Sequence, residues 1–426
     1  MNNFWNLVSF EFKKISQRKI FFTLIFLYFA GVAVLVFSSV SGNSFWHKIG
    51  SDISQYEAME QDKATILSNQ GYITSELIRE AILSNKEMIQ NNDNYFINEH
   101  GKHLKEEAYI KYVLPYESVV KLINTVYEDK LDWLSMDAYE LCSVNPDKAI
   151  NHLTPDMIQD FDADAMEFAM SMVMRQEGLS NTEIEKNIEL LQQIKRPLYN
   201  DFYGGYQAYI KSSKGLALMA LFLILMLLAP LFSNEYEEKT DQIILCTKNG
   251  KGSLCKAKLF VALTVSLVSS ILIMGIGLLS FLAVFGFEGA NVNIQVVNAS
   301  CTYPITLLEA CFIHFISVVI ASVLFGALIA FLSAKVKRRT SLVVMVGTLI
   351  TIIPMFIWVP LKSSRILYNI LKLFPVNSIT FGFDMHFIDI FGVLITPYKF
   401  NGTVSILLTI ALFSMAIYSF KNHKVT

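Results

Sequence analysis

Six long apolar segments set the pattern of this chain, and polar stretches of very different length separate them. An α-helix needs about 20 apolar residues to cross the ~30 Å hydrocarbon core of a bilayer. The pattern therefore predicts an all-α polytopic membrane protein with six transmembrane helices. The six segments are residues 20–40, 215–232, 259–285, 307–334, 341–359 and 404–420.

Residues 41–214 form a polar block after the first segment, and no apolar stretch within it approaches spanning length. Its apolar residues instead recur three, four or seven positions apart, which is the spacing of one face of an α-helix. We expect a mostly helical domain inserted after the first span. The positions behind this prediction are Ile78 and Ile82, Val119 and Ile123, and Ile184, Ile188, Leu191 and Leu198.

The first 19 residues mix bulky apolar side chains with lysine and arginine. Such a segment is typical of an amphipathic helix that lies along the membrane surface. The apolar run that follows is longer than the roughly 7–15 residues of a signal-peptide core, which favours an uncleaved anchor. Residues 1–40 are therefore expected to form a surface helix and the first span.

The composition is also that of a membrane protein. Of the 426 residues, 53% are hydrophobic and 17% charged, whereas soluble chains average about 25% charged. Residues 41–214 hold 16 Lys/Arg against 28 Asp/Glu, a net −12, and the rest of the chain holds 19 against 9, a net +10. The basic residues lie at the ends of the spans, where topology explains them, so they do not indicate binding to nucleic acid.

Lysine and arginine near span ends accumulate on the cytoplasmic side and so predict the orientation. They occur before the first span, after the second and fourth spans and in the tail, whereas residues 286–304 contain none. We expect both termini inside the cell, the domain at 41–214 outside it, and a five-helix membrane domain at 215–426. Within the latter, residues 361–400 hold two apolar stretches at 366–374 and 379–395, which predict short re-entrant or interfacial helices.

No segment carries a signature of nucleotide binding, hydrolysis or metal binding. The stretch Gly250-Lys251-Gly252-Ser253 lacks the spacing of a phosphate-binding loop. We therefore expect no ATPase site, no metal and no cofactor in this chain.

A few ionisable or reactive residues remain as candidates. Glu309 and His314 lie at membrane depth, where an ionisable residue indicates a function by default, here a place in a transport path. Glu309 could equally reach interfacial water. Cys142 and Cys301 could meet in an oxidising compartment, and their pairing stays open.

The most informative polar segment is the loop at residues 233–258, after the second span. Ser233 or Asn234 can cap a helix, and the acidic residues that follow suit the positive end of its dipole. Gly250 and Gly252 are expected to break this helix before Lys258 opens the third span. An interfacial helix that touches no partner would satisfy the same pattern.

This segment resembles the coupling region of ABC type-2 exporter permeases. In that family an acidic stretch after the second span is followed by an apolar Leu-Leu-x-Thr-like run, a glycine turn and a lysine that opens the third span. Residues 235–240 and 245–247, Gly250 and Lys258 match in that order, with Lys239 where glycine is common. The resemblance implies that the partner ATPase docks on Glu235, Tyr236, Glu237, Glu238, Thr240, Leu245 and Thr247.

The resemblance further implies a permease subunit in a bacterial plasma membrane, of the subgroup with a large extracellular domain between the first and second spans. Such a subunit moves an amphipathic compound, such as an antimicrobial peptide, a drug or a lipid. A separate cytoplasmic ATPase binds the ATP, and a second permease chain completes a homo- or heterodimer. The alternative is a membrane sensor or mechanotransmitting scaffold whose extracellular domain binds a ligand or partner without substrate passage.

Overall fold

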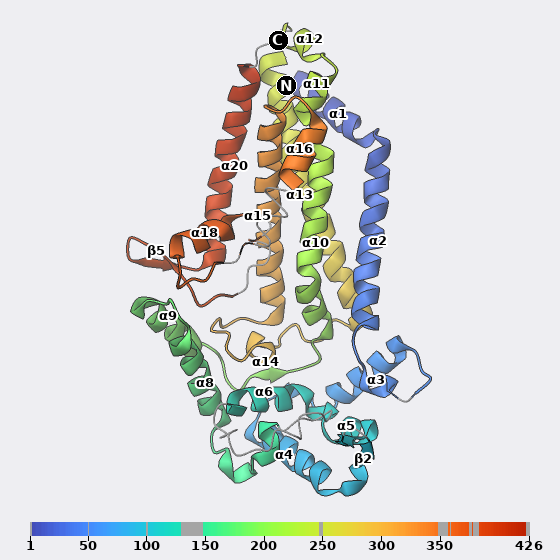
Figure 1. Cartoon of the computed structure of the whole chain (residues 1–426), viewed down its shortest axis with the longest axis vertical. Helices are drawn as coiled ribbons and strands as arrows, with labels where there is room; N and C mark the ends of the chain where they lie inside the picture. The colour runs from blue at the N-terminus through green and yellow to red at the C-terminus, as the bar shows by residue number, and fades with distance from the viewer. Residues whose placement is uncertain are drawn as a thin grey trace. The chain divides into compact units, whose positions relative to one another are not determined.

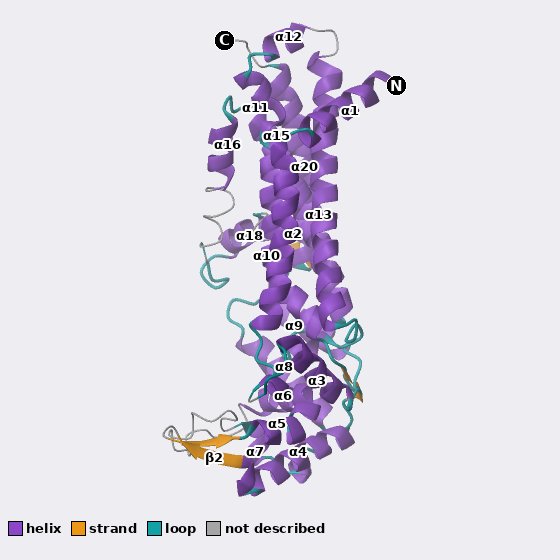
Figure 2. Cartoon of the chain, turned by 90° about the vertical axis from the view of Figure 1, so that its right-hand side faces the viewer, coloured by secondary structure: helices purple, strands orange, loops and turns teal. Residues whose placement is uncertain are grey.

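The structure, a computed structural model, describes residues 2–49, 51–98, 101–128, 148–246, 250–347, 357, 359–374, 377 and 383–422. The chain divides into two compact units, whose elements are drawn in Figures 1 and 2. The membrane unit comprises Met1–Leu35, Tyr209–Ser280 and Cys311–Thr426, and the inserted unit comprises Val36–Ala208 and Phe281–Ala310. The inserted unit therefore also takes in the loop after the third span, which lies outside the 41–214 boundaries expected from the sequence.

Among the described residues, five helices are long and apolar enough to cross a membrane, so the chain is a multi-pass membrane protein. Each coincides with a predicted span. They are Lys19–Ser41 (α2), Gly204–Glu237 (α10, Gly204–Leu228, continued by α11, Pro230–Glu237), Gly252–Phe285 (mainly α13, Cys255–Phe285), Leu307–Ser333 (α15) and Pro397–Lys421 (α20).

The predicted span at 341–359 lies largely outside the described residues, because 348–356 and 358 are not among them. Its start is helical, in α16 (Arg339–Met345). The shorter helices of the membrane unit are α1 (Asn2–Ser16), α12 (Asp241–Cys246) and α18 (Arg365–Leu373), and a π-helical turn at Gly250–Leu254 runs into α13. Gly250 and Gly252 thus begin a helical turn where the sequence predicted a break.

Small residues let the spans of the membrane unit approach closely, as is usual in membrane bundles. A Cβ atom on Gly326 of α15 would overlap the Ser266 hydroxyl of α13 and lie 2.9 Å from its Cβ. A Cβ on Gly277 of α13 would lie 2.5 Å from a methyl group of Leu216 on α10. The helix α13 therefore packs tightly on two neighbours.

We expect Gly326→Ala to destabilise the membrane unit by about 1–3 kcal/mol, because the added methyl group overpacks the contact between α13 and α15. Gly215→Ala is the matched control, since its Cβ would meet only the methyl groups of Leu35 at 3.6 Å, an ordinary contact. Thermal unfolding in one detergent compares the two variants. Equal melting temperatures would contradict the close approach at Gly326.

The inserted unit is mostly helical, and its short strands form two antiparallel pairs, β1 with β4 and β2 with β3. Ile78, Ile82, Val119 and Ile123 are all buried, as their spacing predicted. The helices are α3 (Gln55–Leu67), α4 (Ser75–Gln90), α5 (Glu106–Tyr112), α6 (Glu117–Tyr127), α7 (Ala149–His152), α8 (Phe161–Arg175), α9 (Asn181–Gln192) and α14 (Ile294–Val297), with short 3-10 turns between them. The strands are β1 (Gly71–Tyr72), β2 (Tyr95–Asn98), β3 (Gly101–Leu104) and β4 (Tyr199–Asn200).

The buried face of α9 differs from the predicted one. Ile184 and Ile188 are half-exposed, whereas Glu183, Asn187 and Leu191 are buried. Two polar interactions explain why the buried face of α9 is shifted by one residue from the predicted face. Glu183 forms a capping box with Ser180, and the Asn187 side chain accepts a hydrogen bond of 2.8 Å from the Thr302 hydroxyl. The hydrogen bonds of Glu183 and Asn187 at these two buried positions therefore decide which face of α9 is buried.

Residues 361–400 also depart from the prediction of two short helices. The first apolar stretch forms α18, but residues 388–395 form an antiparallel hairpin of β5 (Ile388–Ile390) and β6 (Val393–Ile395). The prediction of a helix there is wrong because β-branched residues, which favour strands, supply four of the six strand positions. The two turn residues between them, Phe391 and Gly392, both have positive φ, as a tight hairpin requires.

Candidate functional site

The acidic segment after the second span ends a helix, whereas the sequence predicted that it begins one. The span helix passes through Pro230 and continues to Glu237. The Ser333 hydroxyl of α15 accepts hydrogen bonds from the backbone N–H groups of Phe232 and Ser233, at 2.9 and 3.1 Å. Because α15 satisfies these donors beside the proline, Ser233 and its neighbour lie inside the helix instead of capping a new one.

A left-handed turn at Lys239 closes α11 and separates it from α12. Lys239 has a φ of 54°. Its N–H donates to the Tyr236 carbonyl at 3.3 Å, and the Thr240 N–H donates to the Glu235 carbonyl at 3.0 Å. This pair of bonds is a Schellman motif, in which glycine usually occupies the left-handed position.

Lys239→Gly is therefore expected to stabilise this helix end by about 1 kcal/mol, because a residue with a Cβ atom costs about 1–2 kcal/mol in the left-handed conformation. Lys239→Ala removes the same charge but keeps the Cβ atom, so it controls for the lysine head group. Thermal unfolding of both variants in detergent measures the difference. A glycine variant no more stable than the alanine variant would show that the turn is unstrained.

A buried ion cluster lies at the end of α11. Lys258 of α13 is 1% exposed, and its Nζ lies 2.7 Å from Oε1 of Glu235 and 2.9 Å from Oε2 of Glu11. The same ammonium donates to the Leu231 carbonyl at 2.8 Å. Lys14, which is 36% exposed at its side chain, lies 3.0 Å from Glu11 and 3.5 Å from Glu235. Two carboxylates and two ammonium groups thus balance one another.

This cluster connects three elements that are far apart in the sequence. Glu11 comes from α1, Glu235 from α11 and Lys258 from α13. A buried charge is expensive unless it is paired and hydrogen-bonded, and removing one partner of a buried pair typically costs about 3–5 kcal/mol. The three helices are therefore held together by groups that cannot be separated one at a time without a large penalty.

The predicted coupling residues divide between this cluster and the exposed surface. Glu235 is 4% and Tyr236 8% exposed, and the Tyr236 hydroxyl donates to the Ala334 carbonyl at 3.1 Å. Glu237 and Glu238 are exposed. The Thr240 hydroxyl donates to the Glu235 carbonyl at 3.4 Å.

The helix α12 presents an apolar residue outward at the end of this turn. Its first residue, Asp241, is buried, whereas Ile243 is 71% exposed. Leu245 lies within α12, but its side chain and the whole of Thr247 lie outside the described residues. An exposed isoleucine on a short helix that follows a buried ion cluster is an arrangement suited to contact with another protein.

Sequence reasoning did not find Glu11, although a signal exists. Glu11 is the one acidic residue of α1, and it lies three positions after Val8 and four before Ile15, which are both buried. An acidic residue in the middle of an apolar helix face predicts a buried basic partner. Lys258 entered the sequence argument only as the residue that opens the third span.

Glu309 and His314, the predicted residues of a transport path, lie in different surroundings. Glu309 is exposed and begins α15, where its carboxylate accepts a hydrogen bond of 2.8 Å from the Thr306 N–H. The Glu309 N–H in turn donates to the Thr306 hydroxyl, so the two residues cap the start of the helix. His314 is half-buried, and its Nε2 has no hydrogen-bond partner among the described residues.

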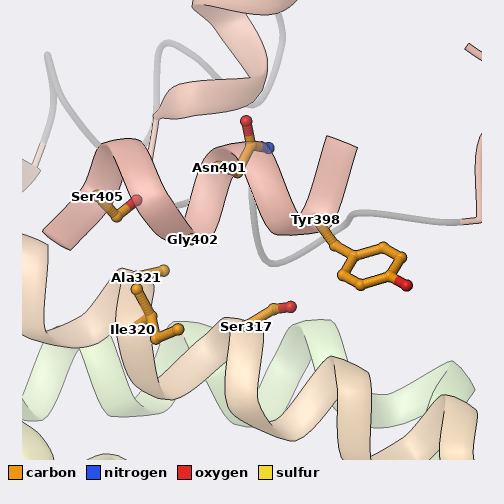
Figure 3. Close-up of a pocket in the computed structure, with 7 residues that line it drawn as sticks. All are labelled: Ser317, Ile320, Ala321, Tyr398, Asn401, Gly402 and Ser405. Carbon is orange, nitrogen blue, oxygen red and sulfur yellow. The ribbon is translucent and has the colours of Figure 1, made fainter. Parts of the chain in front are cut away.

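A narrow hollow between α15 and α20 brings polar groups together at membrane depth (Figure 3). Asn401, Ser405 and Thr409 recur every four residues on the buried face of α20. Ser317 lines the hollow from α15. These polar side chains form a seam between the two spans, and neither Glu309 nor His314 belongs to it.

The remaining sequence candidates and the comparisons add no second site. Cys301 is buried, which raises the pKa of its thiol to about 11, and Cys142 lies outside the described residues. Within the described part of the chain, no group of His, Cys, Asp and Glu has the arrangement of a metal site.

Comparison of the chain with protein-family models, curated proteins and solved structures found no match.

Proposed function

We propose that this chain is the permease subunit of an ATP-driven ABC exporter. The observation that carries the proposal is the buried cluster of Glu11, Glu235 and Lys258, which attaches the base of α12 to two other helices of the membrane unit. A force applied to the exposed tip of α12 at Ile243 would act on a rigidly connected point. This is the property that a docking segment for a motor subunit needs.

The chemistry of ATP hydrolysis belongs to the separate ATPase subunit in this proposal. The chain itself receives motion. Displacement of α12 would pull on Glu235 and, through Lys258, on the long span α13. The α1 helix would follow because Glu11 shares the same ammonium group. Differential affinity of the ATPase for two arrangements of these helices would then shift the population between them.

We place the switch of the coupling mechanism at Glu235. Its carboxylate lies 2.7 Å from the Lys258 ammonium group of α13 and 3.5 Å from the Lys14 ammonium group of α1. A movement of α11 would therefore change the contacts of both other helices at this one residue.

The orientation, partners and substrate class complete the proposal. Both termini and α12 face the cytoplasm of a bacterial cell, and residues 41–214 face the outside. A second permease chain, identical or related, forms the other half of the transporter. The cargo is an amphipathic compound such as an antimicrobial peptide, a drug or a lipid, because such molecules partition into the bilayer that the spans contact.

Affinity purification of the tagged chain from its own membranes tests this function. With a non-hydrolysable ATP analogue, we expect a co-purifying protein that binds nucleotide, in a 1:1 ratio, and weaker recovery of that protein without nucleotide. A chain that is recovered without any nucleotide-binding partner under both conditions would contradict the proposal.

A second candidate, a sensor or mechanotransmitting scaffold, is favoured by the inserted unit. That unit has its own buried core, which includes Met59, Ile82, Met88 and Leu104. A receptor would bind a ligand there with unchanged affinity whether or not nucleotide is present. A mechanotransmitter would keep the ATPase partner but show no ATP-dependent movement of a labelled amphiphile across reconstituted vesicles.

A further inference from the structure

The β5–β6 hairpin places a large apolar side chain at the tip of a two-residue turn. Ile390 pairs with Val393, so the turn consists of Phe391 and Gly392. Their φ values are 53° and 85°. Positive φ at both central residues defines the turn type that normally selects asparagine, aspartate or glycine at these positions.

Phenylalanine is a poor choice for this position if the turn lies in water. A bulky residue with positive φ is a conformational outlier, and such strain tends to persist where function requires it. Phe391 is also 103% exposed, and Val393 beside it is 62% exposed. Transfer of a phenylalanine side chain out of water is favourable and would offset the strain of the turn.

The base of the hairpin is fixed to α18, so the tip projects from a stable support. Asp384 accepts hydrogen bonds from the Tyr368 hydroxyl at 3.0 Å and from the Lys372 ammonium at 3.1 Å. His386 and Asn369 join their side chains at 3.1 Å. All three partners on α18 lie on its polar face.

The opposite face of α18 is apolar and is exposed in the part of the membrane unit that the structure describes. Ile366 is 75%, Leu367 44% and Ile370 49% exposed. Together with Phe391 and Val393 these residues make an exposed apolar set on one attached pair of elements.

The position of the hairpin in the chain identifies what covers this set. β6 ends at Ile395, and the span α20 begins two residues later at Pro397. Residues 390–398 carry no charge, and Tyr398 and Lys399 follow in the first turn of the span. Tyrosine and lysine are typical of the level at which a span meets the lipid head groups. The hairpin is therefore continuous with the lipid-facing end of α20.

We propose that the β5–β6 hairpin is a membrane anchor that inserts Phe391 and Val393 into the interfacial layer of the bilayer. Asp389 limits the depth of insertion. Its carboxylate is exposed and accepts a 2.7 Å hydrogen bond from the Gly392 N–H, and a charged group is too costly to carry into the hydrocarbon centre. The hairpin would hold the start of α20 at a fixed depth. This inference requires only that the chain spans a membrane, and it is independent of the proposed transport function.

An environment-sensitive fluorophore at the tip tests the anchor. F391C would be labelled in the full-length chain after Cys142 and Cys246 are replaced by serine, since Cys255, Cys301 and Cys311 are buried. In phosphatidylcholine–phosphatidylglycerol vesicles we expect blue-shifted emission, quenched several-fold more by lipids with a nitroxide near the head group than by a soluble nitroxide. Y72C, at a side chain 62% exposed on the inserted unit, should show the reverse.

Two results would overturn the anchor. One is emission and quenching at position 391 equal to those at position 72. The other is a spontaneous disulfide between two unlabelled F391C chains in the vesicles, which would make the tip a contact between copies. A label at V393C gives a further check that does not depend on a modified turn residue. The added substitution F391N favours the turn but removes the apolar side chain, so it should lower lipid quenching at 393 while the hairpin still folds.

Discussion

Lys258→Met is expected to destabilise the membrane unit by about 3–5 kcal/mol, the cost of removing the one fully buried ammonium group from two buried carboxylates. Lys14, the other ammonium group beside them, has a side chain that is 36% exposed. Glu11 and Glu235 are 3% and 4% exposed, so water cannot replace the ammonium group. Thermal unfolding of the purified chain in detergent measures the loss. Lys256→Met is the matched control, because Lys256 is exposed two residues earlier on the same helix. Similar losses for both variants would contradict the buried cluster.

The triple variant Glu11→Gln, Glu235→Gln, Lys258→Met separates stability from coupling. Replacing a buried ionic group as a whole is often neutral or stabilising. The triple variant removes the three buried charges and keeps only the ammonium group of Lys14, whose side chain is 36% exposed and can be hydrated. We therefore expect it to recover most of the stability lost in Lys258→Met. The proposed ATPase should still bind through α12, but the proposed ATP-driven movement of cargo should fall at least tenfold.

Ile243→Asp is expected to weaken binding of the ATPase subunit at least tenfold, which corresponds to about 1.4 kcal/mol. The aspartate would bring a charge into the contact that we propose between the 71% exposed isoleucine and the ATPase. The fold should be unaffected because the side chain projects from α12. Quantitative pull-down of the ATPase in the presence of the nucleotide analogue measures the change.

Leu83→Asp provides the comparison for this variant. Leu83 is a 49% exposed apolar residue of the inserted unit, so its replacement adds the same charge at a surface where no ATPase is proposed to bind. Unchanged ATPase recovery is expected for Leu83→Asp. Equal recovery of the ATPase with both variants would show that α12 is not part of the docking surface.

The spans were predictable because lipid imposes one simple requirement on them, about 20 apolar residues in a helix. Each of the five spanning helices among the described residues overlaps a predicted segment, although the helices that begin at Gly204, Gly252 and Pro397 start 7 to 11 residues before the predicted segments. The packing of the spans against one another was harder to predict from the sequence. The close approach at Gly326 depends on which face of α15 meets Ser266, and an apolar segment with little periodicity gives no sign of that.

The local structure of the candidate site differs from the sequence prediction. Glu235 was expected near a helix start, whereas it lies near the end of α11 with its carboxylate buried against Lys258. The reason is that the Ser333 hydroxyl, 100 residues later in the chain, lets the span pass through Pro230. The contribution of Glu11 likewise depends on a contact across 247 positions. The spacing around Glu11 indicates that it needs a buried basic partner, but local spacing does not say which residue supplies it.

Site-specific photo-crosslinking from position 243 tests the proposed function most directly. A photoreactive amino acid in place of Ile243 would be activated in intact membranes with and without the ATP analogue. We predict a nucleotide-dependent adduct with a cytoplasmic ATP-binding-cassette ATPase, and no such adduct from the same amino acid at Leu83. Adducts from position 243 with lipid alone, or with a protein that binds no nucleotide, would contradict the assignment of this chain as an exporter permease.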